Sequence, residues 1–144
     1  RTTYWLLEVT DKGFAADKQS KPPGYLGHGG FKHTVIISRT EAHLKKAGWK
    51  SIQTEKPVGR DGHPVDVYGV SPAGTATAFE ITLSFSNVVT NALKTLSSPT
   101  AVQELVFLCP LDKDCKTVER MLKKDPAVKP YLVQIRIQRI DRYI

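Results

Sequence analysis

The chain has 144 residues, a length that fits one domain with a core of its own. Hydrophobic residues make up 40% and charged residues 24%, a composition typical of globular proteins that excludes a disordered or fibrous chain. Lysine and arginine number 21 against 14 aspartate and glutamate, a formal net charge of +7. Such a surplus favours a polyanionic partner, because contacts with phosphates release condensed counterions; the alternative is a soluble basic protein without such a partner.

Two further classes are excluded by the pattern of apolar residues and cysteines. No apolar run approaches the roughly 18–20 residues that span a bilayer. Residues 1–4, RTTY, are charged and then β-like, so we expect no secretory signal in this sequence. We therefore expect no membrane partner. The two cysteines, Cys109 and Cys115, are too few for a disulfide scaffold or a four-ligand zinc site. They predict a reducing, cytoplasmic location.

The chain divides into a polar N-terminal part and a main domain. Residues 1–28 predict a strand, a turn and a linker rich in Lys, Pro and Gly. The order "strand, T-D-K-G, short helix" in this part resembles the end of a winged-helix DNA-binding domain, which suggests that another domain precedes it. Residues 29–144 form the main domain.

Alternating helix and strand patterns run through the main domain. A helix is predicted up to Gly48, with Lys45 and Lys46 in its last turn, where cations suit the helix dipole. By the same reasoning on periodicity and turn residues, helices are predicted at 31–47, 86–96 and 112–124, and strands at 49–58, 65–70, 75–83, 104–109 and 132–140. Three consecutive strands followed by a βαβ crossover predict an α/β fold with a mixed sheet of about five strands flanked by helices.

Two acidic residues on neighbouring predicted strands are the strongest candidates for chemistry. Asp66 lies between Val65 and Val67, and Glu80 lies in an apolar strand, where a carboxylate is costly unless it is paired or bound to a metal. A hairpin joined at residues 71–74 brings both to one end of the strand pair. With the carbonyl of Ile81 and waters, they would suit Mg²⁺ or Mn²⁺. The alternative is that Asp66 caps a loop and Glu80 pairs with a lysine.

The segments P-V-D at 64–66 and F-E-I-T at 79–82, with this order of elements, resemble the PD-(D/E)xK nuclease superfamily over residues 29–109. They are also similar to restriction-endonuclease-like domains found beside helicases of mobile elements. The resemblance implies a restriction-endonuclease-like core, a Mg²⁺ or Mn²⁺ cofactor and a DNA substrate. Many such enzymes are homodimers, so a homodimer is the assembly it suggests.

The sequence departs from the superfamily pattern at Thr82, where the pattern has a lysine. In the superfamily that lysine positions or deprotonates the attacking water and stabilises charge on the phosphoryl group. Loss of one such stabiliser commonly costs about 10²–10³ in rate. Some members supply the lysine from the following helix, and Asn87, Asn91 and Lys94 share one helix face. Lys94 is therefore the candidate replacement, and its alternative is a solvated surface residue.

Four residues are candidates for contacts with nucleic acid: Lys32, His33, Asn87 and Asn91. In the superfamily the first helix often carries an acid that completes the metal site. Here His33 or Glu41 would stand in for it, and His33 could instead contact phosphate.

Two main hypotheses follow from the sequence, beside a third possibility, a scaffold that touches no nucleic acid and would show no salt-dependent DNA binding. The first is a Mg²⁺- or Mn²⁺-dependent DNA endonuclease in which Asp66 and Glu80 bind the metal, Thr82 aligns the water and Lys94 supplies the missing charge. The second is a catalytically inactive nuclease fold that binds DNA or docks a partner protein, and Thr82 favours it directly. Metal binding separates them, because a ligand that binds only the native state raises its stability.

Overall fold

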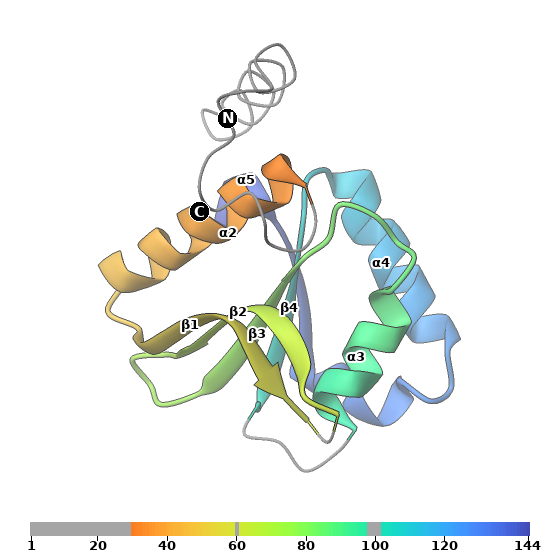
Figure 1. Cartoon of the computed structure of the whole chain (residues 1–144). Helices are drawn as coiled ribbons and strands as arrows, with labels where there is room; N and C mark the ends of the chain where they lie inside the picture. The colour runs from red at the N-terminus through yellow and green to blue at the C-terminus, as the bar shows by residue number, and fades with distance from the viewer. Residues whose placement is uncertain (1–29, 60, 98–101) are drawn as a thin grey trace.

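Five strands form one mixed sheet in the computed structural model, which describes residues 30–59, 61–97 and 102–144 (Figure 1). The strands are β1 (Lys50–Val58), β2 (His63–Val70), β3 (Ala76–Ile81), β4 (Glu104–Cys109) and β5 (Ile135–Arg139), in that spatial order. The first three are antiparallel, and β4 and β5 continue the sheet in parallel to β3. The predicted α/β class with a mixed sheet of about five strands is confirmed.

Helices cover both faces of this sheet (Figure 1). Helix α2 (Phe31–Lys46) and the short α5 (Ile140–Tyr143) pack on one face, and α3 (Val88–Leu96) and α4 (Asp112–Lys124) pack on the other. The central strand β3 is buried along its whole length. Its side chains alternate, so that Ala78 joins the core under α3 and α4 whereas Phe79 joins the core under α2.

Most element boundaries follow from local sequence signals. Helix α2 ends at Lys46, and Gly48 then adopts a left-handed backbone (φ 87°) that favours glycine. The edge strand β1 is irregular. Its register with β2 shifts between Lys50 and Gln53, and Ser51 and Glu55 have positive φ angles of 54° and 52°. Such angles are uncommon outside glycine and mark local strain.

The last predicted strand is partly wrong. A strand was expected over residues 132–140, but a 3-10 helix, η3 (Lys129–Gln134), precedes β5. Pro130 lies at the start of η3, where its fixed φ and missing N–H are tolerated. The alternation of Val133 with its neighbours imitates a strand, yet Val133 is 91% exposed.

Two further expectations concern the N-terminal residues and membrane-spanning helices. The N-terminal strand, turn and linker expected over residues 1–28 lie outside the described residues. Within the described ranges, no helix is both long and apolar enough to cross a membrane.

Candidate active site

A cleft of about 460 Å³ lies where β2 and β3 diverge, between the N-terminal ends of α2 and α3. The strands contribute Asp66, Glu80 and Ile81 to its wall, and Thr82 follows directly after β3. From the helix side come His33, Asn87 and Asn91. The structure thus brings together most of the site residues that the sequence predicted.

Asp66 lies at the point where β2 and β3 separate. The register pairs Val67 with Phe79, so Asp66 and Glu80 occupy the next positions on the two strands. Instead of a backbone pair, Oδ2 of Asp66 accepts a hydrogen bond from the backbone N–H of Ile81 at 2.7 Å. A side-chain oxygen therefore replaces a carbonyl in the ladder, which holds the carboxylate between the strands.

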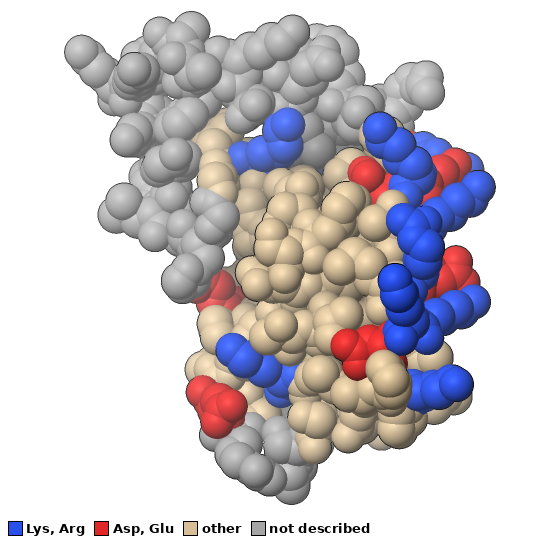
Figure 2. All heavy atoms as spheres, turned by 90° about the vertical axis from the view of Figure 1, so that its right-hand side faces the viewer, with Lys and Arg blue, Asp and Glu red and all other residues tan. Residues whose placement is uncertain are grey.

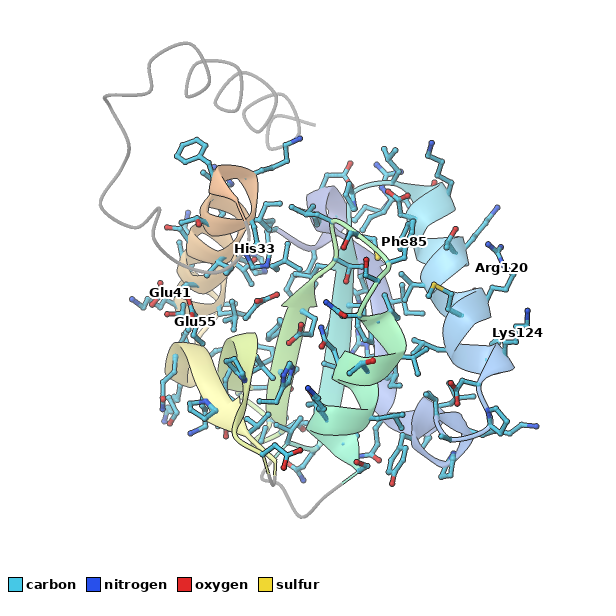
Figure 3. All side chains as sticks on the ribbon, turned by 45° about the vertical axis from the view of Figure 1, so that its right-hand side comes forward. His33, Glu41, Glu55, Phe85, Arg120 and Lys124 are labelled. Carbon is cyan, nitrogen blue, oxygen red and sulfur yellow. The ribbon has the colours of Figure 1, made fainter. Side chains whose placement is uncertain are left out.

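His33 reaches the same oxygen from α2, on the side of the helix that faces the sheet (Figure 3). Its Nε2 lies 3.2 Å from Oδ2 of Asp66. Because a carboxylate oxygen only accepts, Nε2 carries the proton in this contact. Both hydrogen bonds fall on Oδ2, so Oδ1 is the oxygen that is available to a further ligand.

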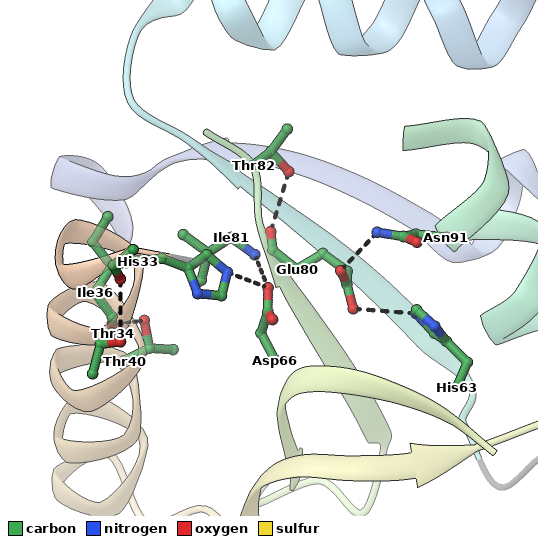
Figure 4. Close-up of polar contacts among 11 residues, drawn as sticks. His33, Thr34, Ile36, Thr40, His63, Asp66, Glu80, Ile81, Thr82 and Asn91 are labelled. Atoms are coloured by element: carbon green, nitrogen blue, oxygen red, sulfur yellow. Dashed lines mark hydrogen bonds and ion pairs between the residues drawn. The ribbon is translucent and has the colours of Figure 1, made fainter. Parts of the chain in front are cut away.

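Glu80 is buried deeper, with 5% of its surface exposed. Its Oε1 accepts a hydrogen bond from Nδ2 of Asn91 at 3.1 Å (Figure 4). Its Oε2 has no hydrogen-bond partner among the described residues and lies 3.8 Å from Nε2 of His63, which also lacks one. Burial raises the pKa of Glu80, the charge of Asp66 adds to this effect, and His63 opposes it.

The lysine position of the superfamily pattern is occupied by a side chain turned toward the backbone. The Thr82 hydroxyl donates to the carbonyl of Glu80 at 3.3 Å and is 6% exposed. Lys94 and Lys32 are exposed and do not line the cleft. Glu41 pairs with Lys45 at 3.4 Å, also away from the cleft. Among the described residues of the lining there is no lysine or arginine.

Sequence reasoning missed two ionisable residues of the lining, His63 and Glu55. No metal-ligand spacing singles out His63. It reaches Glu80 only in the folded sheet, where the start of β2, paired with β1, lies across the cleft from the end of β3. Glu55 carries one of the two left-handed backbones of β1, and strained backbone of this kind clusters at functional sites. The cleft therefore has three carboxylates and two imidazoles on a chain that is basic elsewhere.

The donor atoms of the cleft fit a divalent cation that has few protein ligands and keeps several waters better than one that is coordinated by protein atoms alone. No group of three or more His, Cys, Asp or Glu side chains within residues 30–59, 61–97 and 102–144 is arranged to hold a metal. Mg²⁺, however, usually keeps several waters and binds through one or two carboxylates plus substrate phosphates. Oε2 of Glu80 is buried and makes no hydrogen bond within the described residues, only the long contact with His63, so it is the atom that such a cation would satisfy.

Comparisons of the chain with known protein families, curated proteins and solved structures give no match. What the fold and the cleft establish is therefore an α/β protein with a three-layer arrangement and an acidic cleft at the end of its central strands.

Proposed function

We propose that this chain is a metal-dependent DNA endonuclease of the PD-(D/E)xK type, which hydrolyses phosphodiester bonds in the cleft beside β3. The observation that carries the proposal is the pair of carboxylates on Asp66 and Glu80. They face one cleft from adjacent strands, and Oε2 of Glu80 is buried without a hydrogen-bond partner among the described residues. A buried carboxylate oxygen is costly unless a cation or a donor satisfies it.

The residues that would hold Mg²⁺ or Mn²⁺ are Asp66, Glu80 and the backbone carbonyl of Ile81. When bound, such an ion supplies Lewis acidity and lowers the pKa of its water. His63 lies 3.8 Å from Oε2 of Glu80, and an imidazole nitrogen suits Mn²⁺ better than Mg²⁺ because Mg²⁺ prefers oxygen ligands. We therefore expect stronger activity with Mn²⁺.

Neighbouring side chains orient the two carboxylates. His33 and the N–H of Ile81 hold Asp66 through one oxygen, and Asn91 holds Glu80 through Oε1. Positioning of this kind is worth much to a phosphoryl-transfer site, where catalysis is mostly orientation and charge stabilisation. The Thr82 hydroxyl keeps its lone pairs and would align a water. Lys94, on the helix that carries Asn91, stays the predicted source of positive charge.

The test is cleavage of supercoiled plasmid, single-stranded and branched DNA with Mn²⁺ or Mg²⁺. Asp66→Asn and Glu80→Gln should each abolish metal-dependent nicking. Glu41→Gln removes the same charge from α2, outside the cleft, and should leave nicking intact. Nicking that survives both cleft substitutions would overturn the proposal, and loss of nicking in Glu41→Gln would move the metal site toward α2.

A second function has its own support, a nuclease fold that binds DNA or a partner protein without cutting. Thr82 stands at the lysine position, and the described lining of the cleft holds no lysine or arginine. A phosphoryl-transfer site without a cation to replace that lysine loses about 10²–10³ in rate. Binding of DNA with no cleavage of any substrate would select this function.

Location and assembly follow the proposal. A DNA substrate and the free cysteines Cys109 and Cys115 fit the cytoplasm. A homodimer, which would cut both strands, stays a prediction of the resemblance, and sedimentation would test it.

A further inference from the structure

The exposed side of α4 carries a row of cations. Lys113, Lys116, Arg120, Lys123 and Lys124 are all exposed. Their spacing of three, four, three and one residues keeps them on one helical face, opposite the buried Val118 and Leu122. We call these five residues the α4 cation row.

The figures show that this row faces solvent. The side of the molecule on which α4 lies in Figure 1 carries a band rich in Lys and Arg, with fewer Asp and Glu among them, in Figure 2. Arg120 and Lys124 point away from the sheet in Figure 3. The row is therefore open to a large partner.

Little within the described chain neutralises the row. Lys123 pairs with Glu119 at 2.8 Å, and it is the only member with an ion pair to a described carboxylate. The nearby Asp112 is engaged by Arg139 at 3.2 Å and by Arg142 at 3.9 Å.

The spacing of the α4 cation row also lowers the stability of helix α4. Lys116 and Arg120 are four residues apart, and so are Arg120 and Lys124. Like charges at this spacing destabilise a helix. A helix face that repels itself in this way is suited to an external polyanion, which would relieve the repulsion.

The length of the row suits contact with a nucleic-acid strand. Eleven residues separate Lys113 from Lys124, which at 1.5 Å per residue is about 16 Å. Along one DNA strand, phosphates recur about every 3.4 Å of helix axis, but the strand also winds around that axis, by one full turn in about 34–36 Å. A straight row of about 16 Å therefore covers a short stretch of the backbone, and its cations can contact several phosphates there without a one-to-one match.

We propose that the α4 cation row binds the phosphate backbone of duplex DNA and holds it beside the cleft. Helix α4 packs against α3, whose residue Asn91 lines the cleft, so the row and the cleft flank the same helix. This inference deepens the proposed function by placing the substrate backbone. DNA binding itself does not require cleavage.

The experiment measures DNA affinity by fluorescence anisotropy without added metal, on a labelled short duplex over a salt series. The test variant carries Lys116→Gln, Arg120→Gln and Lys124→Gln together. The control carries Lys45→Gln, Lys46→Gln and Lys50→Gln, which remove the same charge from the exposed end of α2 and the start of β1, on the other side of the sheet. Melting curves establish that both variants fold.

We expect the test variant to lose on the order of 10²-fold in affinity at about 0.2 M salt, and its salt slope to become shallower by about 2.7, as for three lost phosphate contacts. The control should stay close to the unsubstituted protein. Equal losses in both variants would overturn the inference, because net charge alone would explain them. Unchanged binding in the test variant, no DNA binding at all, or a preference for anionic lipid vesicles over DNA would overturn it too.

The outcome is separable from that of the nuclease proposal. A protein that nicks DNA but binds it independently of α4 would refute this inference alone. A protein whose DNA binding depends on α4, but which cuts nothing, would refute the nuclease alone.

Discussion

Replacement of Glu80 by glutamine should stabilise the metal-free protein at neutral pH while it abolishes metal binding. Glutamine keeps the shape of the side chain, and its carbonyl oxygen can still accept from Asn91. The substitution removes a buried carboxyl group that lies beside Asp66 and whose Oε2 makes no hydrogen bond within the described residues, only the 3.8 Å contact with His63. Native residues that favour function over stability are typical of active sites.

The size of the stabilisation by Glu80→Gln follows from the burial of Oε2 without a hydrogen bond. A buried polar atom without a partner costs about 1–3 kcal/mol. Because the glutamine amide satisfies only part of the site, we expect a gain of about 1–2 kcal/mol. For a chain of this size, at about 2–4 °C for each kcal/mol, that is roughly 2–8 °C in Tm.

The pH dependence of stability is a second test of whether Glu80→Gln stabilises the protein. The pKa of Glu80 is raised above its ordinary value of 4.5 in the folded state, chiefly by burial. A group of this kind stabilises the fold most below its unfolded-state pKa, and that contribution is lost as pH rises through the folded-state pKa. The advantage of Glu80→Gln over the unsubstituted protein is therefore largest at neutral pH and shrinks as the pH falls toward 4.5.

With bound metal, the unsubstituted protein should become more stable than Glu80→Gln. At a Mn²⁺ concentration of 100 times Kd, a ligand that binds only the native state adds about 2.7 kcal/mol, and Glu80→Gln should gain none of it. Scanning calorimetry with and without Mn²⁺ at several pH values measures both effects, with Glu41→Gln as the charge-matched control. The reasoning fails if Glu80→Gln is the less stable protein in metal-free buffer at neutral pH, or if Mn²⁺ stabilises it as much as the unsubstituted protein.

Three further predictions concern the core and the thiols. Phe79→Ala should lower the free energy of unfolding by about 3–5 kcal/mol in a urea titration, because Phe79 is fully buried and packs against the ring of Trp49; a loss below about 1 kcal/mol would contradict the packing described. Gly69→Ala should cost about 1–3 kcal/mol in the same titration, since the added Cβ would lie 3.1 Å from the Trp49 ring, and an unchanged midpoint would show that the ring moves aside. Burial raises the pKa of the Cys109 thiol, so a thiol reagent should modify the less buried Cys115 first and reach Cys109 only on unfolding. Rapid native modification in a Cys115→Ser variant would contradict the burial of Cys109.

The sequence predicts the sheet and its helices well because their signals are local. After Glu104, the run at 105–109 is apolar throughout and is followed by Pro110, so β4 is found with its observed bounds. The predicted helix over 112–124 matches α4 for the same reason, since an apolar face alternates with charge. The strand predicted over residues 132–140 begins too early. Val133 alternates with its neighbours like a strand residue, whereas Pro130 favours the 3-10 helix that is found there.

The candidate site was predictable only in part. Asp66 and Glu80 stand out because carboxylates are rare in apolar strands. The approach of His63 to Glu80 depends on how β2 lies beside β3, and the contact of His33 with Asp66 depends on how α2 crosses the sheet. Neither contact can be predicted from the spacing of residues in the sequence. The α4 cation row can be predicted in this way, because its spacing places the cations on one face once the segment is known to be a helix.

The irregular backbone of β1 has a consequence for how copies of this protein meet. A regular edge strand offers unpaired N–H and C=O groups to any other chain, and bulges and twisted segments blunt that edge. β1 has a register shift near its start and left-handed residues at Ser51 and Glu55. At the other edge, β5 is only five residues long and exposes Arg136. Neither edge is a good template for a further strand, so concentrated solutions should resist growth of intermolecular sheets, and self-association is left to the helical faces.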